Sequence, residues 1–189
     1  MEGTEAADCR GHWNIPDTPQ VCDFVGNQDF VHILAISGSL RRTSANSALV
    51  GAVAHLAPDT VDVSIYGELA ELPPFNPDVN DDAAPTAVVR FRAALTACDA
   101  VLIASPEYAH GVPGVLKNAL DWVVASGELI DTPIALINTS ARATHAWTSL
   151  VETLSVMSAR VVLDASITSR SAAGWTQTAS LPTPRSHRP

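Results

Sequence analysis

Five short apolar stretches rich in β-branched residues recur along the chain, and they constrain its fold more than any other feature. They cover residues 31–36, 61–65, 100–104, 134–137 and, more briefly, 161–163. Their apolar residues are continuous rather than alternating, which is typical of strands that are covered on both faces. The sequence therefore predicts a parallel central sheet of five strands.

Helical patterns occupy the intervals between these stretches. Ser44 is a candidate N-cap for one helix, and Pro113 suits the first turn of another. Two further helices are expected at about 85–97 and around 147–154. A strand followed by a helix, repeated every 30 or so residues, predicts an α/β domain with a doubly wound sheet. Ligands of such sheets bind beyond the carboxyl ends of the strands.

The length of 189 residues suits one domain with an extension at each end. Residues 1–29 show neither a helical nor an alternating period, so we expect a poorly ordered N-terminal extension. The domain itself is predicted to span residues 30–166. Residues 167–189 are rich in Ser, Thr, Pro and Arg and lack a period of 3.6, which predicts a disordered tail.

Composition excludes several classes of partner. A net charge of -9 and a single lysine, Lys117, argue against nucleic acid and anionic membranes, which bind clustered cations. No apolar run approaches the roughly 20 residues of a membrane-spanning helix, and the N-terminus is acidic, so we expect a cytoplasmic protein. Cys9, Cys22 and Cys98 form no CxxC pair, and we assign no metal ligand and no disulfide.

The first apolar stretch ends in SGSLRRTSAN, residues 37–46, which reads as a strand, a tight turn and the start of a helix. Gly38 allows a close approach of the backbone, and amide groups at a helix N-terminus favour anions. The motif is neither a P-loop nor a GxGxxG fingerprint. Its polar and cationic side chains suit a terminal phosphate, although a purely structural helix cap is the alternative: Ser39, Arg41, Arg42, Ser44 and Asn46.

A second motif follows the third apolar stretch and makes the pattern specific. It reads SPEYAHGVPGVLKNALDW, residues 105–122, and begins about 60 residues after the first motif. Together the two motifs resemble the NADPH-dependent FMN reductase family, which includes quinone, azo-dye and chromate reductases. The resemblance covers residues 31–164 and implies a flavodoxin-like fold. That family normally continues into a closing helix, which the C-terminal sequence of this chain does not predict.

The resemblance also implies which residues hold the cofactor. The first loop of the family binds the FMN phosphate, and the matching residues are Ser39, Arg41, Ser44 and Asn46. The second loop lies against the flavin ring, and the matching residues are Pro106, Glu107 and Tyr108. Ser140 matches the serine of a third flavin loop. Arg142 is a candidate for the N1/C2 edge of reduced flavin or for an NADPH phosphate, with a solvated loop arginine as the alternative.

The implied activity is an FMN-dependent NAD(P)H oxidoreductase. NADPH or NADH would reduce the flavin, which would then pass electrons to a quinone, a flavin or a similar small acceptor by a ping-pong mechanism. The flavin carries this chemistry, so no catalytic side chain is assigned. The resemblance implies a homodimer or homotetramer. Two alternatives remain open: a flavodoxin-like electron carrier without a nicotinamide site, and a degenerate member that has lost flavin binding.

Overall fold

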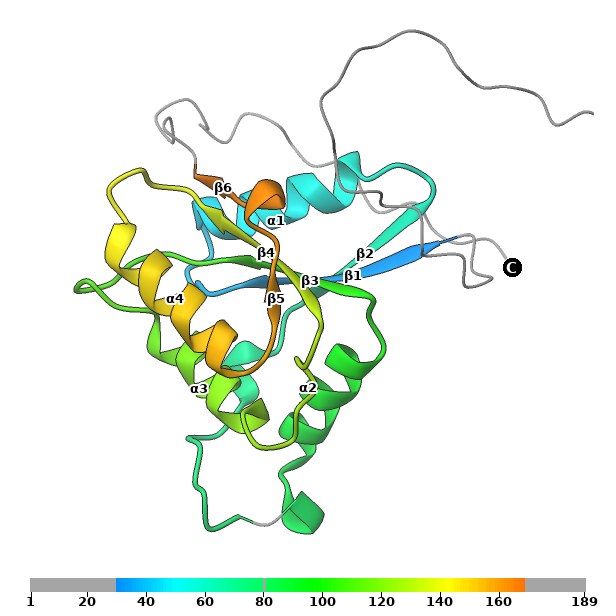
Figure 1. Ribbon diagram of the computed structural model, residues 1–189, viewed down its shortest axis with the longest axis vertical. Helices are drawn as coiled ribbons and strands as arrows, with labels where there is room; N and C mark the ends of the chain where they lie inside the picture. Colours follow the sequence, from blue (N-terminus) through cyan, green and yellow to red (C-terminus); the bar gives the residue numbers. More distant parts are fainter. Residues whose placement is uncertain (1–29, 80, 169–189) are drawn as a thin grey trace, which may run out of the picture.

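A parallel sheet forms the centre of the molecule. The structure is a computed structural model that describes residues 30–79 and 81–168. The predicted extension 1–29 and residues 169–189 of the predicted tail 167–189 lie outside the described residues, whereas Ile167–Thr168 at the start of that tail form a strand. The strand order is β2-β1-β3-β4-β5, every pair is parallel, and β6 also pairs with β4 (Figure 1). The strands are β1 (Val31–Ser37), β2 (Val61–Tyr66), β3 (Ala100–Ala104), β4 (Pro133–Asn138), β5 (Arg160–Val161) and β6 (Ile167–Thr168).

The last edge of the sheet differs in detail from the prediction. One strand was expected at 161–163, but β5 pairs only with Pro133 and Ile134, and the chain then leaves the sheet in the 3-10 turn Leu163–Ala165. It returns as β6, which pairs with the other end of β4. The Ser166 hydroxyl accepts a hydrogen bond from the Leu136 amide at 3.0 Å and bridges the interruption. The predicted five-stranded parallel arrangement is confirmed, with its final strand broken into two short segments.

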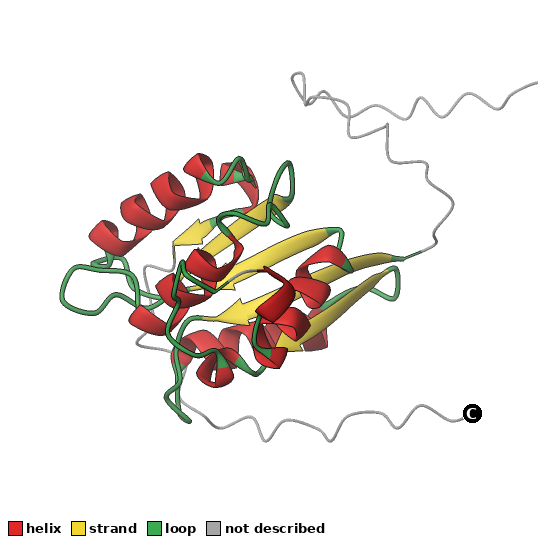
Figure 2. Cartoon of the chain, turned by 90° about the horizontal axis from the view of Figure 1, so that it is seen from below, coloured by secondary structure: helices red, strands yellow, loops and turns green. Residues whose placement is uncertain are grey.

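In the described part of the chain, four α-helices lie on the two faces of the sheet, as Figure 2 shows. They are α1 (Ala45–Leu56), α2 (Thr86–Thr96), α3 (Gly114–Val123) and α4 (Thr144–Val156). Helix α1 packs on one face, where Val50 joins a cluster with Ala35, Leu102 and Ile137. The other three helices bury their apolar residues in a larger core on the opposite face. The predicted doubly wound α/β architecture is therefore confirmed.

The helices begin where local sequence chemistry predicts. The Ser44 hydroxyl accepts hydrogen bonds from the amides of Asn46 at 3.2 Å and Ser47 at 3.5 Å, which makes Ser44 the N-cap of α1. Pro113 precedes the first residue of α3, where its fixed φ of -54° suits a helix start. These caps fix where each helix leaves the carboxyl end of the preceding strand.

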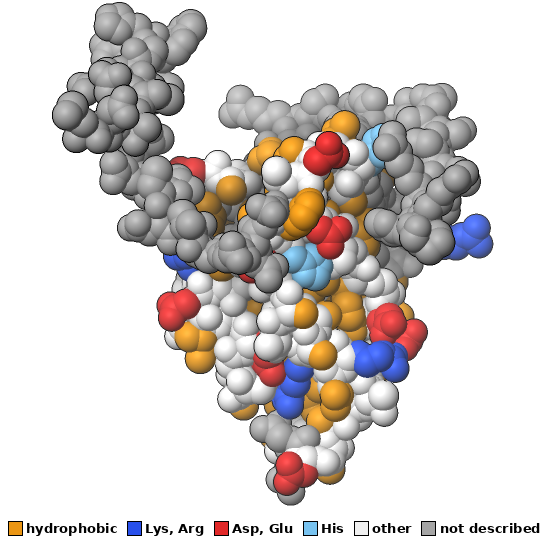
Figure 3. Space-filling view, turned by 90° about the vertical axis from the view of Figure 1, so that its right-hand side faces the viewer, with side chains coloured by type: hydrophobic (Ala, Val, Ile, Leu, Met, Phe, Trp, Pro, Cys, Tyr) orange, Lys and Arg blue, Asp and Glu red, His pale blue; other side chains and the backbone are white. Residues whose placement is uncertain are grey.

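Figure 3 looks onto the right-hand side of Figure 1, where acidic, basic and apolar side chains are interspersed. Burial raises the pKa of the Cys98 thiol, which donates to the Leu95 carbonyl at 3.2 Å, as expected of a packing residue. Within the described ranges, no helix is long and apolar enough to cross a membrane, and no group of three or more ligating side chains could hold a metal.

Candidate functional site

Three loops meet at the carboxyl edge of the sheet, at the left of Figure 1. Loop 1 (residues 38–44) follows β1, loop 2 (105–113) follows β3, and loop 3 (139–143) follows β4. Backbone hydrogen bonds align the strand ends, because the Gly38 amide donates to the Ala104 carbonyl at 2.8 Å and the Ser105 amide to the Ile137 carbonyl at 3.2 Å. The strand order reverses between β1 and β3, which is where ligands bind in open α/β sheets.

Gly38 brings loop 1 into close contact with loop 2. A Cβ atom at this position would lie 3.1 Å from Leu116 Cδ2 and 3.4 Å from Pro106 Cδ. Glycine therefore suits the close packing of loop 1 against loop 2 and α3, because a larger residue would press on Leu116.

Two buried polar side chains, Ser39 in loop 1 and Asn46 in the first turn of α1, hold this part of the site in shape. Ser39 and Asn46 are 8% and 4% exposed. The Ser39 hydroxyl accepts from the Arg41 amide at 3.3 Å, and the Asn46 carbonyl oxygen accepts from the Thr139 hydroxyl at 3.2 Å. The Asn46 side chain thus joins the start of α1 to loop 3, a contact between residues far apart in the sequence.

Loop 1 also presents donors that the protein does not use. Among the described residues, the amides of Thr43, Ser44 and Ala45 at the start of α1 donate to no protein acceptor. Arg41 and Arg42 are exposed, and within the same described ranges neither guanidinium forms an ion pair. Free helix amides beside guanidinium groups are a donor set that fits a phosphate.

Loop 2 contains a tight two-residue hairpin. Tyr108 and Gly111 exchange backbone hydrogen bonds of 3.1 and 2.9 Å, and the two residues between them have positive φ, 49° at Ala109 and 60° at His110. This is the geometry of a type I′ turn. Left-handed backbone is unfavourable for alanine, so the turn is held by its surroundings. It leaves the Tyr108 side chain 55% exposed, where a ligand can contact it.

Glu107 links loop 2 to the start of α4. Its side chain is only 11% exposed, and its Oε2 accepts from the Ala146 amide at 2.8 Å. Its Oε1 lies 3.6 Å from His110 Nδ1, and the His110 ring meets the His145 ring edge to face at 4.3 Å. The carboxylate therefore acts as a helix cap supplied from another loop.

Asn138 fixes the shape of loop 3, and sequence reasoning did not identify it. It is 5% exposed, its Nδ2 donates to the Ala143 carbonyl at 2.7 Å, and its Oδ1 accepts from the Ser140 amide at 2.9 Å. The Ala143 amide also donates to the Ser140 carbonyl at 3.0 Å. The sequence signal that could have identified Asn138 is its polar side chain at the end of an otherwise apolar strand.

The predicted site residues gather in two hollows at this edge. A cavity of about 300 Å³ lies between loops 2 and 3, and a hollow of about 380 Å³ adjoins loop 1. The first is lined by Pro106, Glu107, Asn138, Thr139, Ser140, Arg142 and Ala143. The second includes Ser39 and Arg41 in its wall. The predicted residues Ser44 and Asn46 are buried beside them, and Tyr108 stands on the exposed rim.

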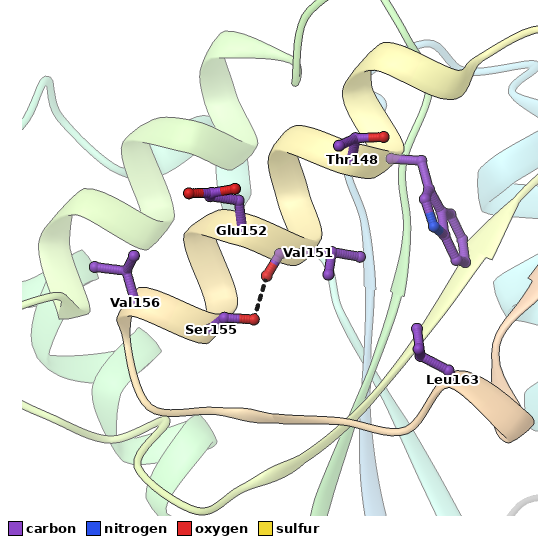
Figure 4. Close-up of a pocket in the computed structure, with 7 residues that line it drawn as sticks. Thr148, Val151, Glu152, Ser155, Val156 and Leu163 are labelled. Atoms are coloured by element: carbon purple, nitrogen blue, oxygen red, sulfur yellow. Dashed lines mark hydrogen bonds between the residues drawn. The ribbon is translucent and has the colours of Figure 1, made fainter.

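A larger hollow of about 650 Å³ lies elsewhere and does not involve the three loops. It follows the outer side of α4, between Thr148, Glu152 and Val156 on the helix and Leu163 after β5 (Figure 4). Ser155 donates to the Val151 carbonyl of its own helix at 2.8 Å. None of the predicted site residues lines this groove.

Comparisons with known proteins agree with this geometry. Residues 31–174 match the family described as NADPH-dependent FMN reductase. The chain is 39% identical over 115 residues to an NAD(P)H-dependent FMN reductase of Pseudomonas aeruginosa, covering 60% of this chain and 62% of that protein. It is 43% identical over 95 residues to a probable NADPH:quinone oxidoreductase of Oryza sativa subsp. japonica, covering 49% and 47%. The chain thus spans about half to three fifths of these curated relatives.

A solved structure shows the same fold. FerB of Paracoccus denitrificans, described as a flavoenzyme NAD(P)H:(acceptor) oxidoreductase, superimposes with a TM-score of 0.64 and 29% identity, covering 70% of this chain and 75% of that one.

Proposed function

Because the chain belongs to the NADPH-dependent FMN reductase family, we propose that it binds FMN and uses NADPH or NADH to reduce a small acceptor such as a quinone or a flavin. The observation that carries the proposal is the junction of loops 1, 2 and 3, where free amides and guanidinium groups stand next to a small cavity. Donor and acceptor would occupy the same open side of the flavin in turn, which is a ping-pong mechanism.

Each loop has a separate task in this proposal. The amides of Thr43, Ser44 and Ala45, with the Arg41 guanidinium, hold the phosphate. Pro106 and Tyr108 support the ring from loop 2, and Ser140 does so from loop 3. Glu107 ties loop 2 to the first turn of α4, which follows loop 3, through the Ala146 amide. Bound FMN supplies the hydride chemistry, so the protein needs no acid-base pair of its own.

Arg41→Ala combined with Ser39→Ala is expected to weaken FMN binding about 10- to 100-fold and riboflavin binding much less. The lost contacts serve the phosphate, which riboflavin lacks, and a hydrogen bond to a charged group contributes about 1.5–3 kcal/mol. Fluorescence titration with both flavins measures the difference.

The matched control is Arg160→Ala. Arg160 is an exposed arginine at the start of β5, where it pairs with the first residue of β4, whereas loop 1 lies at the carboxyl ends of the strands. This control should leave both dissociation constants unchanged. Equal losses of FMN and riboflavin affinity in the double variant would show that loop 1 does not bind the phosphate.

A further inference from the structure

Arg142 is a cationic side chain in the wall of the cavity between loops 2 and 3. Among the described residues that line this cavity, it is the only lysine or arginine. Its backbone is fixed, because its amide donates to the Ser140 hydroxyl at 3.4 Å inside the turn that Asn138 holds. Within the described part of the chain, its guanidinium forms no ion pair.

The acid that shares this wall does not neutralise Arg142. Glu107 directs one carboxylate oxygen to the Ala146 amide at 2.8 Å and the other toward His110 at 3.6 Å. The remaining polar groups of the wall are the neutral side chains of Asn138, Thr139 and Ser140. The cavity wall therefore holds one cation without an ion pair, neutral hydrogen-bonding groups, and a carboxylate whose two oxygens are directed to the Ala146 amide and toward His110. The part of the wall around Arg142 favours an anionic or electron-rich ligand edge.

The position of the cavity indicates which part of FMN could enter it. The cavity of about 300 Å³ lies between loop 2, where the family holds the flavin ring, and loop 3, which carries Arg142, so an edge of the ring can enter it. An oxidised flavin ring is neutral, whereas the two-electron reduced ring concentrates negative charge along its N1 and C2 carbonyl edge. A cation at this wall therefore stabilises the reduced ring more than the oxidised one.

We propose that Arg142 binds the N1 and C2 carbonyl edge of the reduced flavin and raises its midpoint potential. The proposal rests on the proposed function, since it requires FMN at these loops. It gives this arginine a role in making reduction by NADPH or NADH more favourable, separate from the binding of the phosphate at loop 1.

The test compares Arg142→Gln and Arg142→Lys with the matched control Arg160→Gln, in the full chain loaded with FMN. Arg142→Gln should weaken the binding of reduced FMN about five- to tenfold more than the binding of oxidised FMN, as expected for the loss of one partly solvated charge. The midpoint potential, measured by anaerobic dye equilibration, should fall by about 20–30 mV, because a tenfold change in a two-electron equilibrium corresponds to about 30 mV. Arg142→Lys should restore part of the shift, and Arg160→Gln should cause none.

An unchanged midpoint potential in Arg142→Gln would overturn the proposal. If the variant instead lost its preference for NADPH over NADH at an unchanged potential, Arg142 would bind the nucleotide phosphate and the proposal would be wrong. FMN binding by the wild-type chain is measured by titration before any potential. If the wild type bound no FMN, the proposed function itself would be wrong.

Discussion

Asn138→Ala is expected to lower the free energy of unfolding by about 2–4 kcal/mol and to weaken FMN binding at least tenfold. The change removes one buried and one partly buried hydrogen bond and leaves the Ala143 carbonyl and the Ser140 amide without their partner. Each buried group left unsatisfied costs about 1–3 kcal/mol. Loop 3 then loses the shape that places Ser140 and Arg142 at the cavity. Urea denaturation and fluorescence titration with FMN measure the two effects.

Leu95→Ala provides the control for stability alone. Leu95 is 2% exposed near the end of α2, at the opposite edge of the sheet from the three loops. Its truncation should cost about 2–5 kcal/mol, while FMN affinity well below the melting temperature stays within twofold of the wild type. If Asn138→Ala destabilised the protein but kept full FMN affinity, loop 3 would not belong to the flavin site.

Gly38→Val is expected to have the second large effect, through the packing of loop 1 against loop 2. A Cβ atom alone would lie 3.1 Å from Leu116 Cδ2 and 3.4 Å from Pro106 Cδ, and the two methyl groups of valine add further bulk to this contact. Overpacking of this kind typically costs about 1–3 kcal/mol. The strain should also displace loop 1, so we expect a melting temperature lower by several degrees and FMN affinity reduced at least tenfold.

Gly51→Val is the matched control, since nothing lies within 4 Å of a Cβ atom at Gly51 in α1. Valine has a higher helix propensity than glycine, so this variant should be as stable as the wild type or slightly more stable. Thermal unfolding of the two variants side by side separates a general effect of valine from the close contact at Gly38. Equal melting temperatures would show that loop 1 adapts and that its position is not fixed by packing.

The elements of this fold could be predicted because their signals are local. Continuous apolar stretches located β1 to β4, and Ser44 and Pro113 marked the starts of two helices within a residue. The broken edge strand could not be predicted in the same way. It depends on the 3-10 turn Leu163–Ala165 and on a Ser166 hydroxyl that bonds to β4, and neither has a hydrophobic signature.

The site residues, too, could be predicted only where their signals are local in the sequence. The residues of loops 1 and 2 could be chosen from two contiguous motifs, and the structure brings them to one edge of the sheet. The contacts that hold the loops together join distant residues, such as Glu107 with the Ala146 amide and Asn46 with Thr139. No spacing in the sequence reveals such pairs, because they form only after the parallel sheet aligns the strand ends.

Anaerobic reduction of the full chain loaded with FMN tests the central claim most directly. FMN is added to the purified protein, unbound flavin is removed, and the flavin absorbance is followed after NADPH or NADH is mixed in without any partner reductase. We expect about one FMN per chain and rapid loss of the flavin absorbance, which returns when a quinone is added. Bound FMN that stays oxidised would indicate an electron carrier. A chain that retains no FMN would contradict the proposal that this protein is an FMN-binding enzyme.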